Sequence, residues 1–225
     1  MPRIGRIVAP GEAHHVTQRG NNRQDVFFVN DDRSVYLNIL KQQSEIYGFK
    51  VLGYCLMTNH VHIIGVPENK ESLFKAIGRT NWRYTQYINR FHNRSGHLWQ
   101  NRFYSCVLDE SHLLAAMAYI ERNPVRAGMV RKSWNHKWSS AKAHVERNDE
   151  SGLLDMKRWN AIIGNTDWRG ILVKPDDDEI KVALRSSTSR GRPLGSDGFI
   201  SKIEKFVGKR VRPLPVGRPK KTKEK

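Results

Sequence analysis

Short apolar runs of strand length alternate with longer amphipathic stretches over the first 145 residues of the chain. A run of four to eight apolar residues predicts a strand, and an apolar stripe at helical spacing predicts a helix. The predicted strands cover residues 14–18, 49–57, 60–66 and 102–108. The predicted helices cover residues 31–47, 71–92 and 109–123, and Pro124 would end the third.

These elements follow the order strand, helix, strand, strand, helix, strand, and one more helix comes after them. The order is that of the ferredoxin-like split βαββαβ unit. In such a unit the two inner helices cover one face of the sheet, and the other face stays free for a ligand or a third helix. We therefore predict an α+β fold, a ferredoxin-like palm with an additional helix and a basic C-terminal extension.

The composition of the chain changes after the predicted palm. We expect one domain over residues 1–148, a partly folded extension over 149–189 and a basic tail over 190–225. Trp159 and Trp168 indicate that the extension folds onto the domain.

Within the C-terminal part, residues 185–196 are rich in Ser, Gly and Arg, which is typical of a linker. Residues 199–211 predict a short amphipathic helix that ends at Gly208. The last segment, residues 190–225, contains 12 Lys and Arg residues against 3 Asp and Glu residues.

The charge balance indicates the kind of partner. The chain has 225 residues, with 39 Lys and Arg against 22 Asp and Glu, a net charge of +17. Nucleic acid is the usual partner of such a chain, because phosphate contacts release counterions. No apolar run approaches the roughly 18 residues of a membrane span, and no signal peptide is evident. The two cysteines, Cys55 and Cys106, fit a reduced cytosol.

His60 and His62 are separated by one residue in a predicted strand. Side chains at i and i+2 share one face of a strand, so both imidazoles can reach one metal ion. Val61 and Ile63 would point to the opposite, helix-covered face. The alternative is a pair of half-exposed histidines on an amphipathic strand.

Tyr119 lies in the third predicted helix, away from the apolar stripe of Leu113, Met117 and Ile120. His112, Ala115 and Asn123 share its side of the helix. A tyrosine in this position can point into an open site. The alternative is a partly packed surface tyrosine.

Basic and amide side chains gather in segments that also carry aromatic residues, a pattern typical of single-strand DNA binding. The alternative is a solvated helix face over core aromatics. Two Gly-Arg-Pro motifs in the tail resemble AT-hooks, which place Arg in the minor groove, or form a generic electrostatic tail. The candidate DNA-binding residues in these segments are Arg19, Asn21, Asn22, Arg23, Arg79, Arg83, Arg102, Arg192 and Arg218.

Several long strings occur in a fixed order over the first 145 residues: HHVTQRGNNRQDVF, GYCLMTNHVHII, GHLWQNRFYS, YIERNPVRAGMV and WSSAKAH. Together they resemble the REP-associated tyrosine transposases of the single-tyrosine HUH transposase superfamily. The resemblance implies that His60 and His62 are ligands of a Mg²⁺ or Mn²⁺ ion, which Asn123 completes. It also implies that Tyr119 is the nucleophile.

The resemblance further implies a substrate and a mechanism. The substrate would be a single-stranded DNA hairpin, like a repetitive extragenic palindrome, with a flanking guide tetranucleotide that Arg3, Arg6 and the Arg19–Arg23 loop contact. Cleavage would pass through a 5′-phosphotyrosine, with His112 or Arg122 as candidate groups for activating the tyrosine. The protein would be a monomer or homodimer on the nucleoid in a bacterial cytoplasm.

Two alternatives stay open at this stage. A domesticated hairpin-DNA-binding protein without catalysis would keep the same basic segments. A metal-dependent hydrolase using the His-x-His pair would need further carboxylate or histidine ligands.

Overall fold

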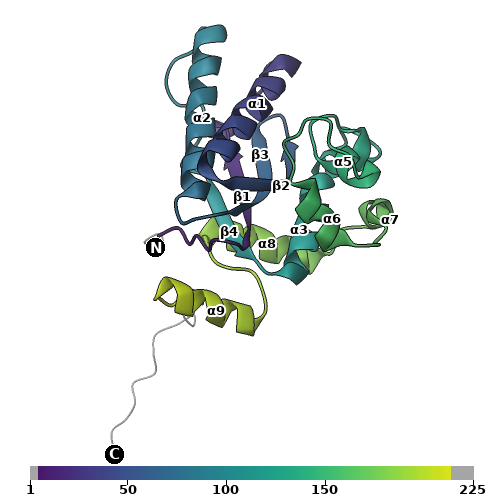
Figure 1. The fold of residues 1–225 in the computed structure, drawn as a ribbon. Coiled ribbons are helices and arrows are strands. Elements are labelled where there is room, and N and C mark those ends of the chain that lie inside the picture. The colour runs from purple at the N-terminus through teal and green to yellow at the C-terminus, as the bar shows by residue number, and fades with distance from the viewer. Residues whose placement is uncertain (1–4, 214–225) are drawn as a thin grey trace, which may run out of the picture.

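Four antiparallel strands form the centre of the molecule in a computed structural model that describes residues 5–213 (Figure 1). The strands are β1 (Ala13–Arg19), β2 (Phe49–Leu56), β3 (His60–Pro67) and β4 (Tyr104–Leu108). They lie side by side in the order β2-β3-β1-β4. Since the split βαββαβ unit produces this order, the predicted α+β fold is confirmed.

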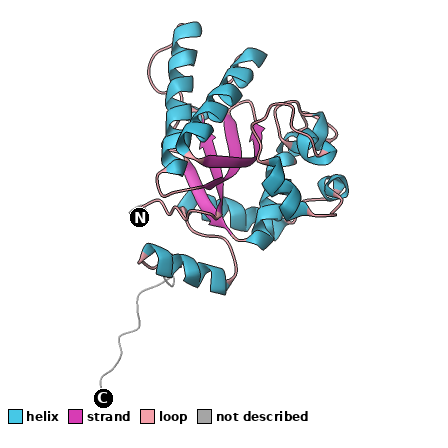
Figure 2. Cartoon of the chain, viewed as in Figure 1, coloured by secondary structure: helices cyan, strands magenta, loops and turns pink. Residues whose placement is uncertain are grey.

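Two long helices cover one face of this sheet (Figure 2). They are α1 (Asn30–Tyr47) and α2 (Ser72–Phe91). Tyr36 and Tyr84 are fully buried between these helices and the sheet, in one core with Val61 and Ile63 of β3. The alternation around the histidines of β3 therefore works as predicted, with Val61 and Ile63 on the face covered by α1 and α2.

The opposite face is also covered by helices. They are α3 (Glu110–Glu121) and α8 (Asp178–Arg190). Met117 of α3 and Leu184 of α8 are fully buried in one core with Ile64. Gly53 of β2 permits the close approach of α3, because a Cβ at this position would collide with the Sδ atom of Met117.

The remaining helices of the described chain before α8 are shorter. They are η1 (Asn21–Arg23), α4 (Asn123–Arg126), η2 (Ser133–Asn135), α5 (Ala141–Glu146), α6 (Met156–Ile163) and α7 (Trp168–Val173). Trp159 and Trp168 are buried and meet edge to face, with ring centroids 4.9 Å apart. The extension therefore folds onto the domain, as expected, whereas boundaries at residues 148 and 189 stay predictions.

The predicted linker at residues 185–196 is wrong, because residues 185–190 are the last turns of α8. Ser and Thr disfavour helix interiors when their hydroxyls compete with the backbone. Here Thr188 is buried, and its hydroxyl contacts the side chains of His15 and Cys106, so it does not compete with the backbone of the helix. Gly191 then ends α8 with a φ of 68°, and Leu194 donates its N–H to the Val107 carbonyl of β4, 2.8 Å away.

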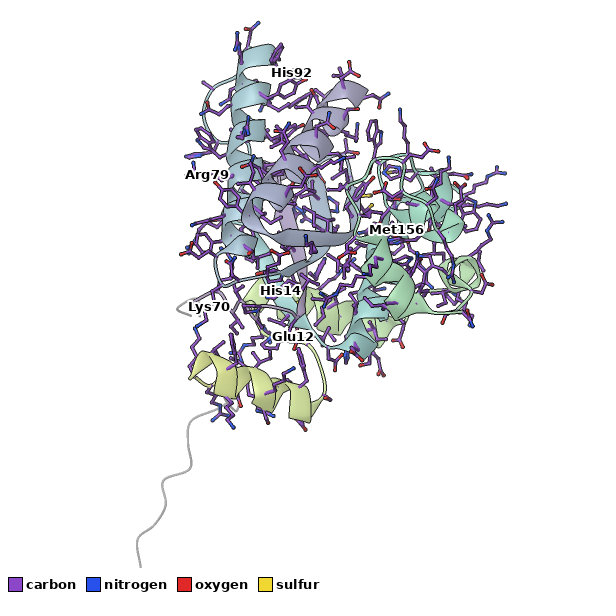
Figure 3. The ribbon with its side chains drawn as sticks, viewed as in Figure 1. Glu12, His14, Lys70, Arg79, His92 and Met156 are labelled. Carbon is purple, nitrogen blue, oxygen red and sulfur yellow. The ribbon has the colours of Figure 1, made fainter. Side chains whose placement is uncertain are left out.

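The helix predicted at residues 199–211 is present as α9 (Asp197–Val207), and Gly208 follows its end. Ile203 of α9 packs on Ile7 and Val107, and Lys202 forms an ion pair with Glu12 at 2.7 Å. Figure 3 places Glu12 and Lys70 on the side of the main body that faces α9. Within the described part of the chain, no helix has the length and apolarity needed to cross a bilayer.

Candidate active site

A cavity of about 640 Å³ lies between the sheet and the helices of its second face. Its lining includes four residues that the sequence singled out for chemistry: His60, His62, Tyr119 and Asn123. Arg19, a predicted DNA contact, lines the same cavity. The remaining lining residues are His15, Thr17, Met57, Tyr104, Arg126, Ala127, Arg185, Thr188 and Ser189.

Hydrogen bonds orient both histidines of β3. The Nδ1 atom of His62 lies 2.9 Å from Nε2 of His15, and Nδ1 of His15 lies 2.8 Å from Oγ1 of Thr188. The Nδ1 atom of His60 lies 2.7 Å from Oδ1 of Asn59, an oxygen that only accepts. With Nδ1 occupied in each ring, Nε2 is the nitrogen left for a ligand of either histidine.

The histidines of the cavity are neutral near pH 7. Burial, followed by the nearby charge of Arg19, lowers the pKa of His60 to about 4. Burial lowers the pKa of His15 to about 3, and burial followed by repulsion from His15 holds the pKa of His62 well below its usual value. A neutral imidazole is the form that binds a metal ion.

Few side chains in the cavity could serve as ligands of a metal ion. Among residues 5–213, no group of three or more His, Cys, Asp or Glu side chains is placed to hold a metal ion, so a site at His60 and His62 would need another kind of third ligand. His60 and His62 have ring centroids 5.2 Å apart, and Asn123 lines the same cavity. The Asn123 Oδ1 atom accepts from the Arg126 guanidinium, and its Nδ2 atom is buried without a partner. Two neutral imidazoles and an amide fit a divalent ion that keeps open positions for other ligands.

Tyr119 points its hydroxyl into the cavity from α3. Its Oη atom accepts from Nε of Arg185, 3.0 Å away, and its ring meets the ring of His62 edge to face at 5.9 Å. The guanidinium of Arg126 lies 4.3 Å from the centre of the tyrosine ring. The tyrosine is largely buried, so it is a lining residue of the site and not a loose surface side chain.

The residues that follow Tyr119 anchor its helix. Glu121 is fully buried, and its carboxylate accepts from Nε1 of Trp168 at 2.8 Å and from Oγ of Ser140 at 2.5 Å. Arg122 donates to Asp176 at 2.9 Å. Helix α3 ends at Glu121, before Pro124, as predicted to within two residues. Pro124 falls in the first turn of the separate helix α4, where no N–H donor is needed.

The two groups proposed to activate the tyrosine lie elsewhere. His112 contacts Asp109 at 2.7 Å, at the start of α3, and Arg122 is held by Asp176. Neither of them lines the cavity. The expectation that His112 or Arg122 activates Tyr119 is therefore wrong for this arrangement.

The loop after β1 lies beside β3. Arg19 pairs with His60 across the two strands, and Nδ2 of Asn59 donates to the Arg23 carbonyl at 2.8 Å. Asn22 and Arg23 are exposed, with positive φ angles of 49° and 60°. The loop therefore presents polar and basic groups beside His60.

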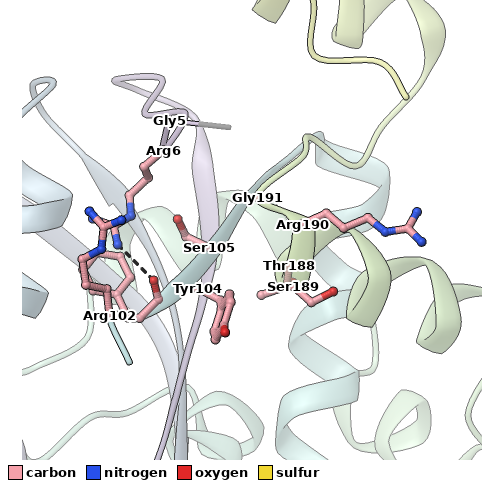
Figure 4. Close-up of a pocket in the computed structure, with 10 residues that line it drawn as sticks. Gly5, Arg6, Arg102, Tyr104, Ser105, Thr188, Ser189, Arg190 and Gly191 are labelled. Atoms are coloured by element: carbon pink, nitrogen blue, oxygen red, sulfur yellow. Dashed lines mark hydrogen bonds between the residues drawn. The ribbon is translucent and has the colours of Figure 1, made fainter. Parts of the chain in front are cut away.

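A second, smaller pocket of about 140 Å³ adjoins the cavity and shares Tyr104, Thr188 and Ser189 with it (Figure 4). Arg6 and Arg102 line this pocket, so two more predicted DNA contacts lie beside the site. The Arg6 guanidinium lies 3.6 Å from the centre of the Phe103 ring and donates to the Phe103 carbonyl. Burial, followed by repulsion from Arg102, lowers the pKa of Arg6 to about 10.

The other predicted DNA contacts are not at the cavity. Arg79 and Arg83 are exposed on α2, on the other side of the sheet, and Figure 3 shows Arg79 on the outer surface. Arg192 donates to the Val211 carbonyl at 3.0 Å, so residues 191–195 are not a free AT-hook-like arm. Arg3 and Arg218 lie outside the described residues. DNA binding by these residues stays a prediction.

The lining residues that sequence reasoning missed include His15, Arg126, Arg185 and Thr188. His15 could have been found, since it shares a strand with the predicted loop contacts and alternates with Val16. Arg185 and Thr188 carried no signal, because their segment resembles a linker.

Three comparisons with known proteins bear on this site. The family model described as "Transposase IS200 like" matches residues 12–123. A Haemophilus influenzae protein, provisionally named a REP-associated tyrosine transposase, is 28% identical over 145 residues, which cover 58% of this chain and 80% of that protein. The solved structure of a REP-associated tyrosine transposase bound to a REP hairpin matches with a TM-score of 0.56 and 18% identity.

This structural match covers 69% of the present chain and 90% of the other, and it supports the shared fold. The resemblance inferred from the sequence strings is thereby confirmed. The matched segment contains β1–β4, His60, His62, Tyr119 and Asn123. Residues 12–123 therefore form a domain of the IS200-like transposase family, whose members cleave and join DNA.

Proposed function

We propose that this protein is a single-strand DNA endonuclease and strand transferase that acts on palindromic hairpins through a 5′-phosphotyrosine on Tyr119. One observation carries the proposal: the hydroxyl of Tyr119 and the ring of His62 meet in one cavity, with arginines around them. The family match supports the coarser activity, DNA cleavage and joining.

In the cleavage step the Tyr119 oxygen attacks phosphorus in line, and the bond between phosphorus and the 3′ oxygen breaks. The phenol loses its proton, and the departing oxygen gains one to become a free 3′-OH. The phosphoester energy is kept in the tyrosine link, so a second 3′-OH can reverse the step and join strands. A Mg²⁺ or Mn²⁺ ion held by His60, His62 and Asn123 would act as a Lewis acid on a non-bridging phosphate oxygen.

Arginines supply the positive charge of the site. Arg19, Arg126 and Arg185 line the cavity, and no carboxylate is among the lining residues. A phosphate diester entering the cavity therefore meets fixed donors and cationic charge, which stabilise the extra charge that develops during attack. Hydrogen bonding to Arg185 also holds the Tyr119 hydroxyl in one direction.

A hairpin partner fits the distribution of the other basic groups. The pocket of Arg6 and Arg102 lies beside the cavity and can accept an unpaired nucleotide next to the cleaved phosphate. The Arg19–Arg23 loop borders the cavity at His60. Arg79 and Arg83, on the other side of the sheet, would contact a different part of the DNA, through phosphates.

The tyrosine and the histidines of one site belong to the same chain. A single copy therefore contains the complete arrangement, which supports catalysis within a monomer, with a homodimer as the alternative. We place this activity on the nucleoid of a bacterial cytoplasm.

The test is incubation with a pool of end-labelled single-stranded hairpins and Mn²⁺, followed by a denaturing gel. A label that stays on the protein and disappears in Tyr119→Phe supports the proposal. Tight hairpin binding without any adduct, in Mg²⁺ or Mn²⁺, would instead favour a domesticated hairpin-binding protein without catalysis.

A further inference from the structure

Helix α8 lies outside the segment that matches the transposase family, yet it forms one wall of the cavity. Its start is tied to the tyrosine helix, because Asp176, just before α8, forms an ion pair with Arg122 at 2.9 Å and another with Arg126. Its end is tied to β4 through Leu194. The position of α8 over the sheet is therefore fixed at both ends.

One side chain of α8 contacts the reacting atom of the proposed reaction. Nε of Arg185 donates to Oη of Tyr119 at 3.0 Å, and the guanidinium carbon lies 5.7 Å from the centre of the tyrosine ring. The hydroxyl of a tyrosine can rotate about its C–O bond, and the whole ring can rotate about the side-chain torsions. The hydrogen bond selects one of these orientations, and correct orientation of a nucleophile is a large part of catalysis.

A second side chain of α8 controls the metal-ligand histidine. For Nε2 of His62 to bind an ion, its proton must sit on Nδ1 and be donated to Nε2 of His15. His15 must then carry its own proton on Nδ1, where Oγ1 of Thr188 accepts it at 2.8 Å. As an acceptor, the hydroxyl of Thr188 stabilises the pair of tautomers that leaves Nε2 of His62 open.

Arg185 and Thr188 are three residues apart, so they share one face of α8. Leu184 on the same helix is fully buried and supplies an apolar contact with the core. Thr188 is also buried, and a buried hydroxyl costs free energy unless it is hydrogen-bonded. Its partners are the Nδ1 atom of His15 and the sulfur of Cys106, 3.1 Å away.

We infer that α8 completes the active site in cis: Arg185 is a catalytic residue that directs the Tyr119 hydroxyl, and Thr188 is a positioning residue that acts on His62 through His15. This inference rests on the proposed function. It assigns the C-terminal extension a part in the chemistry, beyond the catalytic segment that the family defines.

The role of Thr188 is tested by Mn²⁺ binding, with no cleavage involved. Mn²⁺ is titrated into the hairpin complex of a Tyr119→Phe chain, and the free ion is followed by electron paramagnetic resonance. Adding Thr188→Val should weaken Mn²⁺ binding by about 10-fold or more, because ligand-orienting partners have effects of this size. Thr188→Ser, which keeps the hydroxyl, should restore binding to within about 3-fold of the parent.

Two outcomes of this titration would overturn the role of Thr188. Equal Mn²⁺ affinity with valine and threonine would show that the hydroxyl does not act on His62. Equal weakening by valine and serine would show a packing effect. Thermal unfolding of each variant checks that the chains are folded.

The role of Arg185 is tested by single-turnover cleavage at saturating hairpin. Arg185→Ala should lower the rate by about 10- to 100-fold and change the hairpin Kd by less than about 3-fold. Free guanidinium at millimolar concentration should restore part of the rate. The control is Lys181→Ala, which removes a charge from the same helix, where Lys181 pairs with Asp178 and not with Tyr119.

A wild-type cleavage rate in Arg185→Ala would overturn the role of Arg185. The role would also be overturned if Arg185→Ala and Lys181→Ala slow cleavage equally and guanidinium does not restore the rate. Failure of the proposed function looks different, since either the wild-type chain would then form no covalent adduct or Tyr119→Phe would still form one. If Tyr119→Phe abolishes the adduct while the Arg185 and Thr188 variants behave as wild type, only the inference about α8 fails.

Discussion

The two faces of the sheet are both covered by helices, but they bury different kinds of side chain. Under α1 and α2, Tyr36 and Tyr84 meet edge to face at 5.1 Å, and the Tyr84 hydroxyl donates to a backbone carbonyl. Under α3 and α8, Tyr119 contacts His62, and its hydroxyl accepts a hydrogen bond from the charged side chain of Arg185.

This difference shows where chemistry can take place. Buried polar groups cost free energy unless they are paired. On the first face they are paired with the backbone and with an amide, so the arrangement is complete without a ligand. On the second face they are paired in a chain of side chains that ends at an open cavity. The second face is therefore the one that can bind and change a substrate.

The largest expected effect compares one buried tyrosine from each face. Tyr119→Phe should reduce covalent adduct formation by at least about 10³-fold, because the nucleophilic oxygen is removed. Tyr84→Phe should keep the adduct but lower the free energy of unfolding by about 1–3 kcal/mol, because the Val26 carbonyl loses its donor. Gel analysis and urea unfolding measure the two effects. Loss of adduct in both variants would remove the distinction between the faces.

The next effect compares two fully buried carboxylates, Asp32 in the first turn of α1 and Glu121 at the end of α3. Asp32 accepts from the N–H of Phe28 at 2.7 Å, and Glu121 accepts from Trp168 at 2.8 Å. Replacing either by Ala should lower the free energy of unfolding by on the order of 3 kcal/mol, because buried donors lose their partners.

Only the Glu121→Ala variant should also slow single-turnover cleavage, because Glu121 holds the helix that carries Tyr119. The exposed Glu146, 3.9 Å from Lys142, serves as control, and Glu146→Ala should change the unfolding free energy by less than about 0.5 kcal/mol. Equal cleavage rates for the Asp32 and Glu121 variants would contradict this difference between the faces.

A smaller effect concerns pH and His14, a buried histidine of β1, the strand that pairs with β3. Burial lowers the pKa of His14 to about 4, below the 6.5 of an unfolded chain. The unfolded state then binds more protons, so the contribution of His14 to stability is complete above pH 6.5 and is lost between pH 6.5 and 4. The loss amounts to up to about 3 kcal/mol. Urea unfolding of wild type and His14→Gln at pH 7 and pH 4.5 should show a smaller loss in the variant.

The smallest effect is expected on the outer surface of α2. Arg79→Gln with Arg83→Gln should weaken hairpin binding by about 10-fold at most, and should lower the slope of log Kd against log salt by about 1–2. Cleavage at saturating DNA should stay as in wild type, since both arginines lie on the other side of the sheet from Tyr119. An unchanged salt slope would show that DNA does not reach this surface.

Much of the palm was predictable because its signals are local. Alternation in β3 placed His60 and His62 opposite Val61 and Ile63, and the order of elements led to the observed strand order. The tyrosine helix was predicted at residues 109–123, and in the structure it runs from Glu110 to Glu121, with the short helix α4 starting at Asn123. The nearness of Tyr119 to His62 came from the family resemblance and not from spacing.

The sequence by itself determined the sheet, its two inner helices and the candidate histidines and tyrosine, because period-2 and period-3.6 patterns act between near neighbours along the chain. Only the tertiary structure decided that α8 covers the supposedly free face and brings Arg185 and Thr188 to Tyr119 and His15. These contacts join residues 66 and 173 positions apart. No local pattern encodes such pairs, since they depend on how apolar burial of Leu184 docks a Ser-rich helix onto the sheet.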